Sequence, residues 1–160
     1  MNTIIIVHSL SGTTLEFSEH IAAKLRENKH TVHLIHLQTD PVIKSGTVRH
    51  SIPFKFTNFP EIKEYELILL GGPVWAFSAS PVVISALDKM EDLSGKKLLP
   101  FVTMGFFHPS LGGRQAINMI SSKAREKGAT ILPGKIIPKL FHDFRNLFKV
   151  EAEDIVKNII

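Results

Sequence analysis

Near its beginning the chain reads Ile4-Ile5-Ile6-Val7-His8-Ser9-Leu10-Ser11-Gly12-Thr13-Thr14. Four consecutive β-branched residues predict a buried strand, and the polar residues after them predict a loop. Apolar residues then recur at helical spacing as far as Leu25, so a helix follows the loop. The backbone N–H groups and hydroxyls of such a loop, with the positive end of the helix dipole, can bind an anion. The stretch therefore predicts either a phosphate-binding loop or an ordinary helix cap.

Strands and helices alternate along the rest of the chain. Apolar patterns predict strands over residues 31–37, 66–70, 97–103 and 129–137, the last interrupted by Pro133 and Gly134. Helices are predicted from Pro81 to Met90, over residues 116–124 and over residues 150–159, the last after a loop with Phe141, Phe144, Leu147 and Phe148. Residues 38–60 predict a loop, and residues 61–64 a turn or a short helix.

Five strands interleaved with helices predict an α/β fold. We expect one domain over residues 1–160, a doubly wound three-layer sandwich whose five-stranded parallel sheet has the order 2-1-3-4-5. In that order ligands bind outside the carboxyl ends of the first and third strands. The loops after the first, third and fourth strands should therefore meet at one site.

Composition narrows the classes of function. The chain has 160 residues, 44% of them hydrophobic, and a net charge of +4 whose basic residues are scattered, so no nucleic-acid partner is expected. It has no cysteine, which excludes disulfides, a thiolate nucleophile and cysteine-ligated clusters. No apolar run has the form of a signal peptide or a membrane span, so a cytoplasmic protein is expected. No metal is expected either, since His30, His33 and His36 are not spaced to share one strand face.

The first loop lacks the fingerprints of nucleoside triphosphatases and of dinucleotide-binding proteins. Its pattern, Ser9-x-Ser11-Gly12-x-Thr14, resembles the flavodoxin phosphate loop, [ST]-x-T-G-x-T, with Ser11 in place of the usual threonine. The resemblance implies FMN as cofactor. It also implies that the phosphate is bound by Ser9, Ser11, Gly12, Thr13 and Thr14.

The loop after the third strand carries the only tryptophan of the chain, in Leu70-Gly71-Gly72-Pro73-Val74-Trp75. This segment resembles the flavodoxin ring loop, L-G-x-S-x-W-G, and implies that the flavin ring is held by Pro73, Val74, Trp75, Ala76 and Phe77. Trp75 would stack on the ring, or else cap the core beneath the loop. Flavodoxins commonly have glycine where Ala76 stands. Alanine adopts positive φ at a greater cost, so we expect two-electron chemistry to be favoured over one-electron chemistry.

The loop after the fourth strand lacks the acidic residue and the tyrosine of classical flavodoxins. Its glycines resemble those of the flavodoxin-like quinone and flavin reductases. This resemblance implies that Thr103, Met104, Gly105 and Phe106 bind the ring edge and leave one ring face open for a second substrate. His8 and His108 fall near the expected site, where either could relay protons or could lie by chance.

The sequence thus predicts an FMN-binding redox protein and leaves three hypotheses open. The first is an oxidoreductase that passes electrons from a reduced donor, such as NAD(P)H, to a quinone or similar acceptor. The second is an electron carrier that acts with a redox protein, and the third is an interaction module without cofactor. Because classical carriers are acidic and this chain is basic, the first is favoured. The oligomeric state stays open, since reductases of this shape often form dimers.

Overall fold

The structure is a computed structural model that describes residues 1–45 and 52–159. Its centre is a parallel sheet of β1 (Asn2–Val7), β2 (Thr31–His36), β5 (Leu67–Trp75), β7 (Lys97–Met104), β8 (Thr130–Ile131) and β9 (Lys135–Pro138). The strands follow the order β2-β1-β5-β7, and β8 and β9 both pair with β7. This arrangement confirms the predicted α/β sandwich and the strand order 2-1-3-4-5, with the fifth strand split at Pro133 and Gly134.

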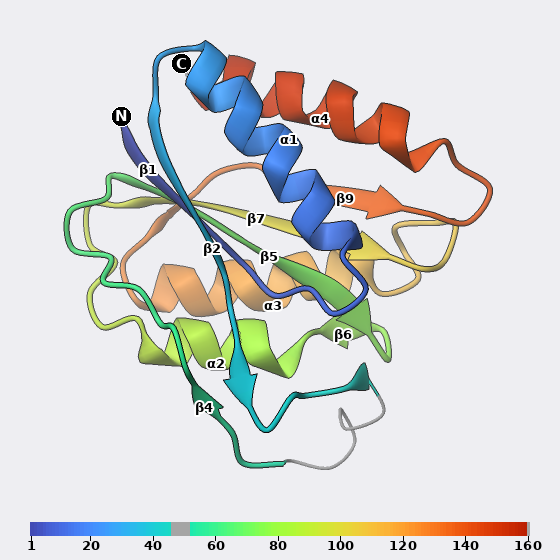
Figure 1. The fold of residues 1–160 in the computed structure, drawn as a ribbon, viewed down its shortest axis with the longest axis horizontal. Coiled ribbons are helices and arrows are strands. Elements are labelled where there is room, and N and C mark those ends of the chain that lie inside the picture. Colours follow the sequence, from blue (N-terminus) through green and yellow to red (C-terminus); the bar gives the residue numbers. More distant parts are fainter. Residues whose placement is uncertain (46–51, 160) are drawn as a thin grey trace.

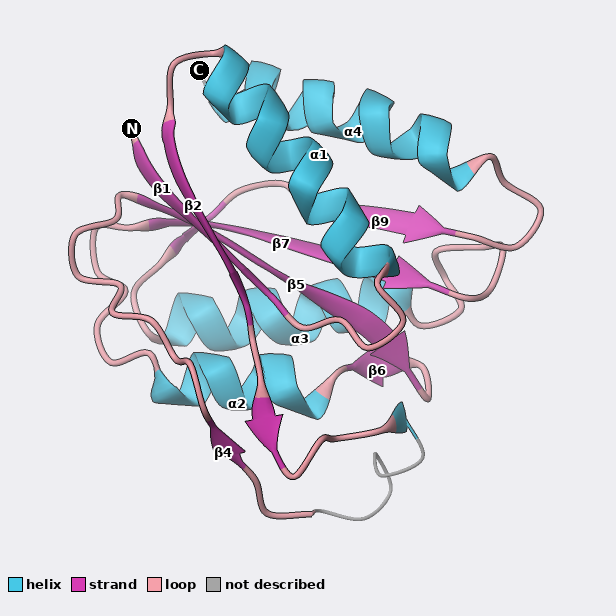
Figure 2. Ribbon diagram, in the orientation of Figure 1, coloured by secondary structure: helices cyan, strands magenta, loops and turns pink. Residues whose placement is uncertain are grey.

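Helices cover both faces of the sheet (Figure 1 and Figure 2). On one face lie α1 (Thr13–Glu27) and α4 (Phe144–Ile159), and on the other lie α2 (Pro81–Lys89) and α3 (Gly113–Glu126). Ile4 and Ile6 belong to the core beneath α2 and α3, whereas Ile5 and Val7 belong to the core beneath α1 and α4. Because β1 is buried on both faces, all four positions require apolar side chains.

β5 continues beyond the predicted end at Leu70 and includes the glycines and proline that were expected in a loop. That prediction is wrong because the backbone of this segment pairs with the neighbouring strand, Gly71 with Phe101 and Pro73 with Thr103. A Cβ on Gly71 would lie 2.1 Å from the Phe101 ring. The glycine therefore serves close packing inside a strand, a use that turn signals alone do not reveal.

The region after β2 contains more structure than the predicted loop. β3 (Thr39–Asp40) pairs antiparallel with β4 (Lys55–Phe56) in a small separate sheet. Gly46, one of the residues on which the loop prediction rested, lies outside the described residues. Residues 61–64 form a turn and no helix.

α4 begins at Phe144, not at residue 150, so the prediction that placed Phe144, Leu147 and Phe148 in a loop is wrong. Phe148 is fully buried and stacks on Phe17 of α1 with ring centroids 5.2 Å apart. The apolar positions continue at helical spacing through Ala152 to Ile159. The aromatic residues are therefore the first turns of this helix. No helix among the described residues is both long and apolar enough to span a bilayer.

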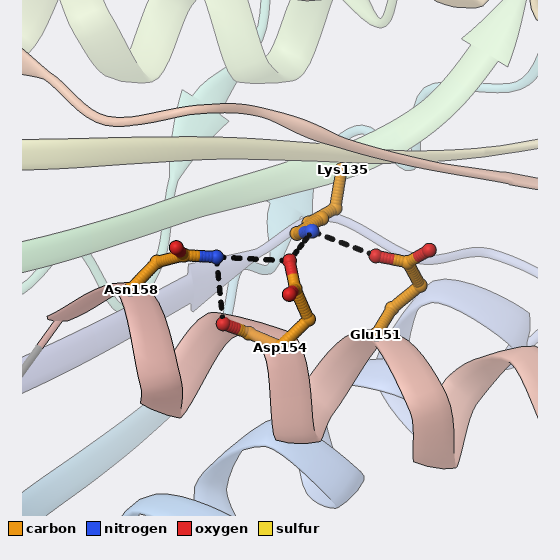
Figure 3. Close-up of polar contacts among 4 residues, drawn as sticks. All are labelled: Lys135, Glu151, Asp154 and Asn158. Atoms are coloured by element: carbon orange, nitrogen blue, oxygen red, sulfur yellow. Dashed lines mark hydrogen bonds and ion pairs between the residues drawn. The ribbon is translucent and has the colours of Figure 1, made fainter.

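Lys135 ties α4 to β9 (Figure 3). Its ammonium pairs with Glu151 at 2.8 Å and with Asp154, whose carboxylate also accepts a bond from the Asn158 amide at 2.9 Å. Burial lowers the pKa of Lys135, but the bonds to the two carboxylates outweigh burial and leave the pKa raised. The ion pairs hold the strand that leads the chain to the carboxyl edge of the sheet.

Candidate functional site

The loops that follow β1, β5 and β7 meet at the carboxyl edge of the sheet. Thr14, in the first turn of α1, and Thr103, near the end of β7, share a hydrogen bond of 2.7 Å between their hydroxyls. Both residues are buried. The bond joins the first loop to the end of β7, where the predicted ring-edge loop, called the third loop below, begins.

The first loop leaves the N-terminus of α1 open. Gly12 is the N-cap, with φ of +92°, and no side chain caps the helix there. Its own N–H turns back and donates to Ser9 Oγ at 3.1 Å. An ordinary cap would satisfy the N–H groups of the first turn with the side chain of the N-cap residue. This loop is built differently, and the first-turn N–H groups and the helix dipole are left to bind an anion.

A lysine that the sequence analysis missed also reaches this loop. Lys139 Nζ donates to Thr13 Oγ1 at 3.1 Å, although 126 positions separate the two residues. Lys139 directly follows β9. Its position after the last strand, at the edge where the loops converge, was the signal that could have revealed it.

One cavity connects the first loop with Trp75. It has a volume of about 310 Å³ and is lined by Leu10, Ser11, Thr14, Ser45, Pro73 and Trp75. Trp75 is partly buried at the end of β5, and its indole meets the His8 imidazole edge-on with ring centroids 5.1 Å apart. The structure therefore brings the predicted phosphate loop and the predicted stacking residue to the same space.

A second cavity, of about 390 Å³, lies between the other two loops. Its lining residues are Val74, Ala76, Phe77, Met104, Gly105, Phe106, Leu111 and Leu140. Phe77 and Phe106 stack on each other here, with centroids 5.5 Å apart and ring planes within 5°. Because successive residues of a strand point to opposite sides, Pro73 and Trp75 face the first cavity and Val74 faces the second. The predicted ring-binding residues are thus divided between two spaces.

Ala76 and Phe77 form the two-residue connection between β5 and β6 (Ser78–Ala79). Their φ angles are +48° and +62°. Alanine thus adopts positive φ at position 76 in this chain despite its greater cost. A two-residue hairpin needs left-handed residues to match the twist of its strands, and this requirement outweighs the local cost. The preference for two-electron chemistry stays a prediction.

His8 lies beneath this site and does not suit the proton relay suggested by the sequence. Burial, and secondarily the charge of His36, lower the pKa of His8 to about 4. Its Nδ1 is 2.7 Å from Ser80 Oγ, and Ser80 also accepts the Val82 N–H as the N-cap of α2. A relay at neutral pH needs a pKa near neutrality, which His8 lacks. His108 lies in the third loop, with its Nδ1 2.6 Å from Ser110 Oγ.

A model of the flavodoxin family matches residues 43–140, which is 98 of the 160 residues. The chain belongs to the flavodoxin family. The match covers the ring loop and the loop after β7, and the first loop lies outside it. A comparison with curated proteins finds no match.

Solved flavodoxin structures share the fold over almost the whole chain. Flavodoxin 1 from Bacillus cereus is 23% identical, with a TM-score of 0.67 and 98% of each chain covered. A flavodoxin from the domain Archaea is 20% identical, with a TM-score of 0.65, and the match covers 98% of this chain and 97% of that one. The rubredoxin oxygen:oxidoreductase of Desulfovibrio gigas matches 98% of this chain over 35% of its own length, at 16% identity and a TM-score of 0.65.

As a flavodoxin-family member, the chain has FMN as its cofactor and acts in electron transfer with redox partners. The residues at the carboxyl edge fit this group. The open N-terminus of α1 and the hydroxyls around it suit a phosphate, and Trp75 offers an aromatic face in the adjoining cavity. Among the described residues, no group of three or more acidic or histidine side chains is placed to hold a metal.

Proposed function

We propose that this flavodoxin-family chain is an FMN-dependent oxidoreductase that passes electrons from a reduced donor, such as NAD(P)H, to a quinone or similar planar acceptor. FMN supplies the redox chemistry, and the protein binds and orients the reacting molecules. The observation that carries the proposal is the second cavity, an apolar space beside the ring loop that the phosphate loop does not occupy.

Each of the three loops at the carboxyl edge of the sheet has a role in this proposal. The backbone and hydroxyls of Ser9, Ser11, Gly12, Thr13 and Thr14 bind the phosphate. Pro73 and Trp75 hold the flavin ring in the first cavity, with Val74, Ala76 and Phe77 shaping the opposite side of the same strand and turn. The backbone of residues 103–106 binds the ring edge, since Gly105 has open space where a Cβ would stand.

The second cavity suits a planar acceptor because of its aromatic wall. Phe77 and Phe106 are about half exposed, at 55% and 48%, so their stacked rings remain accessible at the rim. A quinone ring can stack beside them, while Val74, Leu111 and Leu140 supply apolar contacts. Apolar walls with few polar groups favour a neutral acceptor over a charged one.

An electron carrier is the second candidate, and one observation favours it. The left-handed conformation of Ala76 shows that the turn beside the flavin site adopts positive φ without glycine. The chain therefore does not lack the backbone geometry that glycine usually provides at this position.

The test is anaerobic reduction of the FMN-loaded protein, first with dithionite and then with NADH or NADPH, followed by a quinone. Direct bleaching by the nicotinamide and repeated turnover with the quinone are expected for the oxidoreductase. Reduction by dithionite through a long-wavelength absorption band, with no turnover, would overturn the enzyme proposal and support the carrier.

Leu111→Trp tests the acceptor cavity directly. It should raise the quinone KM about tenfold and leave the FMN Kd within about twofold, because Leu111 lines the second cavity and does not line the cavity between the phosphate loop and Trp75. Val150→Trp on the exposed surface of α4 is the matched control and should change neither value. An unchanged quinone KM in Leu111→Trp would remove the acceptor from this cavity.

A further inference from the structure

Lys139 is held at the phosphate loop from two sides. Its backbone N–H donates to the Met104 carbonyl at 3.0 Å, which fixes the chain beside the end of β7. Its ammonium donates to Thr13 Oγ1 at 3.1 Å and lies 5.2 Å from the centre of the Phe144 ring. Lys139 is also partly buried. The hydrogen bond and the aromatic ring therefore restrict a side chain that would adopt many conformations in free solvent.

The position is electrostatically unusual. Thr13 is the first residue of α1, and the start of a helix carries the positive end of the dipole, where acidic side chains are favoured and cations are not. Among the described residues, no carboxylate lies within ion-pair distance of Lys139. Glu16, the acidic residue of the first turn, is 3.0 Å from Arg145 instead. The loop therefore combines a helix N-terminus with a lysine whose charge no acidic side chain pairs.

An anion resolves this arrangement, because the dipole and the ammonium then both stabilise the same charge. The phosphate monoester of FMN carries about two negative charges at neutral pH, and a charge-assisted bond to ammonium is stronger than a bond between neutral groups. The flavodoxin pattern quoted for the first loop contains no basic residue. Lys139 lies outside that pattern, after β9, and adds a positive charge at the loop.

We propose that Lys139 is a phosphate-binding residue of the FMN site and that it selects FMN over riboflavin, which has the same ring and no phosphate. The proposal rests on the assignment of residues 9–14 as the phosphate loop. If the Lys139 ammonium pairs with the FMN phosphate, part of the FMN affinity comes from the attraction of two full charges. The FMN affinity should therefore fall as the salt concentration rises, whereas the riboflavin affinity should not.

Binding titrations on the apoprotein test this without any assay of turnover. FMN and riboflavin are each titrated at low and high salt, with flavin fluorescence as the readout. Lys139→Met removes the charge and keeps an apolar side chain over Phe144, and Lys139→Arg keeps the charge. Lys97→Met removes a charge at the opposite edge of the sheet, at the first residue of β7, and is the matched control.

Lys139→Met should raise the FMN Kd about tenfold or more at low salt, leave the riboflavin Kd within about twofold and flatten the salt dependence. Lys139→Arg should stay within about threefold of the parent, and Lys97→Met should match the parent. An FMN Kd that Lys139→Met leaves unchanged would overturn the proposal, as would an equal loss of FMN and riboflavin.

The same titrations separate this failure from that of the loop assignment. If the parent protein prefers FMN to riboflavin and Gly12→Val loses that preference, but Lys139→Met keeps it, the loop binds the phosphate and Lys139 does not. If the parent shows no preference for FMN, the phosphate loop and the role of Lys139 are both wrong.

Discussion

Thr14 and Thr103 share a buried hydrogen bond of 2.7 Å that joins the first turn of α1 to the end of β7. The two residues come from different predicted loops, one for the phosphate and one for the ring edge. Their contact sets the distance between these parts of the FMN site, since neither end can shift without breaking it.

Thr103→Val should therefore weaken both stability and FMN binding. The change leaves the buried Thr14 hydroxyl without this partner, which costs about 1–3 kcal/mol in the free energy of unfolding. Urea unfolding of the apoprotein measures the loss. The double variant Thr14→Val with Thr103→Val removes both hydroxyls and should recover part of the stability, so additive losses in the two single variants would show that the bond contributes nothing.

Gly12→Val should abolish FMN binding, with a Kd at least about 100-fold higher, because valine at φ of +92° both strains the loop and fills the space for the phosphate. Gly95→Val is its matched control. Gly95 has φ of +74°, open space around the missing Cβ and a position before the start of β7, at the opposite edge. Both variants should lose about 1–2 kcal/mol of stability, and only Gly12→Val should lose FMN. Equal FMN affinity in the two would end the phosphate-loop assignment.

Gly112→Ala should loosen the contact between the two aromatic loops. Gly112 has φ of +107°, and a Cβ there would lie 2.6 Å from the Phe77 Cα, a backbone atom that cannot move aside cheaply. We expect a loss of about 1–3 kcal/mol in the free energy of unfolding, measured by urea titration. Gly105→Ala, in the same loop, meets nothing within 4 Å and should stay within about 0.5 kcal/mol of the parent. Equal losses would locate the effect in the loop backbone and not in the contact with Phe77.

His8 should make the apoprotein less stable in mild acid. Its pKa is about 4 in the folded protein and about 6.5 when unfolded, so the unfolded chain binds more protons between these values. The contribution of neutral His8 to the free energy of unfolding is fully present above about pH 6.5. It decreases as the pH falls, by about 2 kcal/mol between pH 7 and pH 5. His8→Asn, which keeps a polar atom for Ser80, should flatten this part of the curve. Urea unfolding at several pH values measures the slope, and an unchanged slope in the variant would contradict the prediction.

Much of the fold could be predicted because local patterns of apolar residues indicate which segments are buried. The strand at Ile4–Val7 is apolar throughout since both faces are covered, and Pro81 and Gly128 mark helix ends by backbone chemistry alone. The extension of β5 through Gly71 could not be predicted, because the reason for that glycine is the Phe101 ring of another strand. The predicted start of α4 at residue 150 is too late, because the apolar pattern of the helix already begins with Phe144 and Phe148.

Some residues of the candidate site could likewise be predicted from local patterns, and others depend on contacts between distant parts of the chain. Ser9, Gly12 and Trp75 stand in short motifs that a sequence displays directly. Lys139 does not, because its meaning depends on a contact with Thr13 across 126 positions and on the absence of any carboxylate paired with it among the described residues. The left-handed turn at Ala76 and Phe77 is likewise set by the strands that it connects and not by residue type.

Because Trp75 contacts His8 edge-on and lines the first cavity, its intrinsic fluorescence can report on both. Trp75 is the only tryptophan, so all indole fluorescence comes from the cavity that the phosphate loop shares. Energy transfer to a bound flavin should quench this emission in proportion to occupancy, and riboflavin and FMN can be compared on one scale without labels. In the apoprotein, the same emission should change as His8 gains its proton near pH 4. The emission of one side chain thus reports FMN occupancy during a flavin titration and the protonation of His8 during an acid titration of the apoprotein.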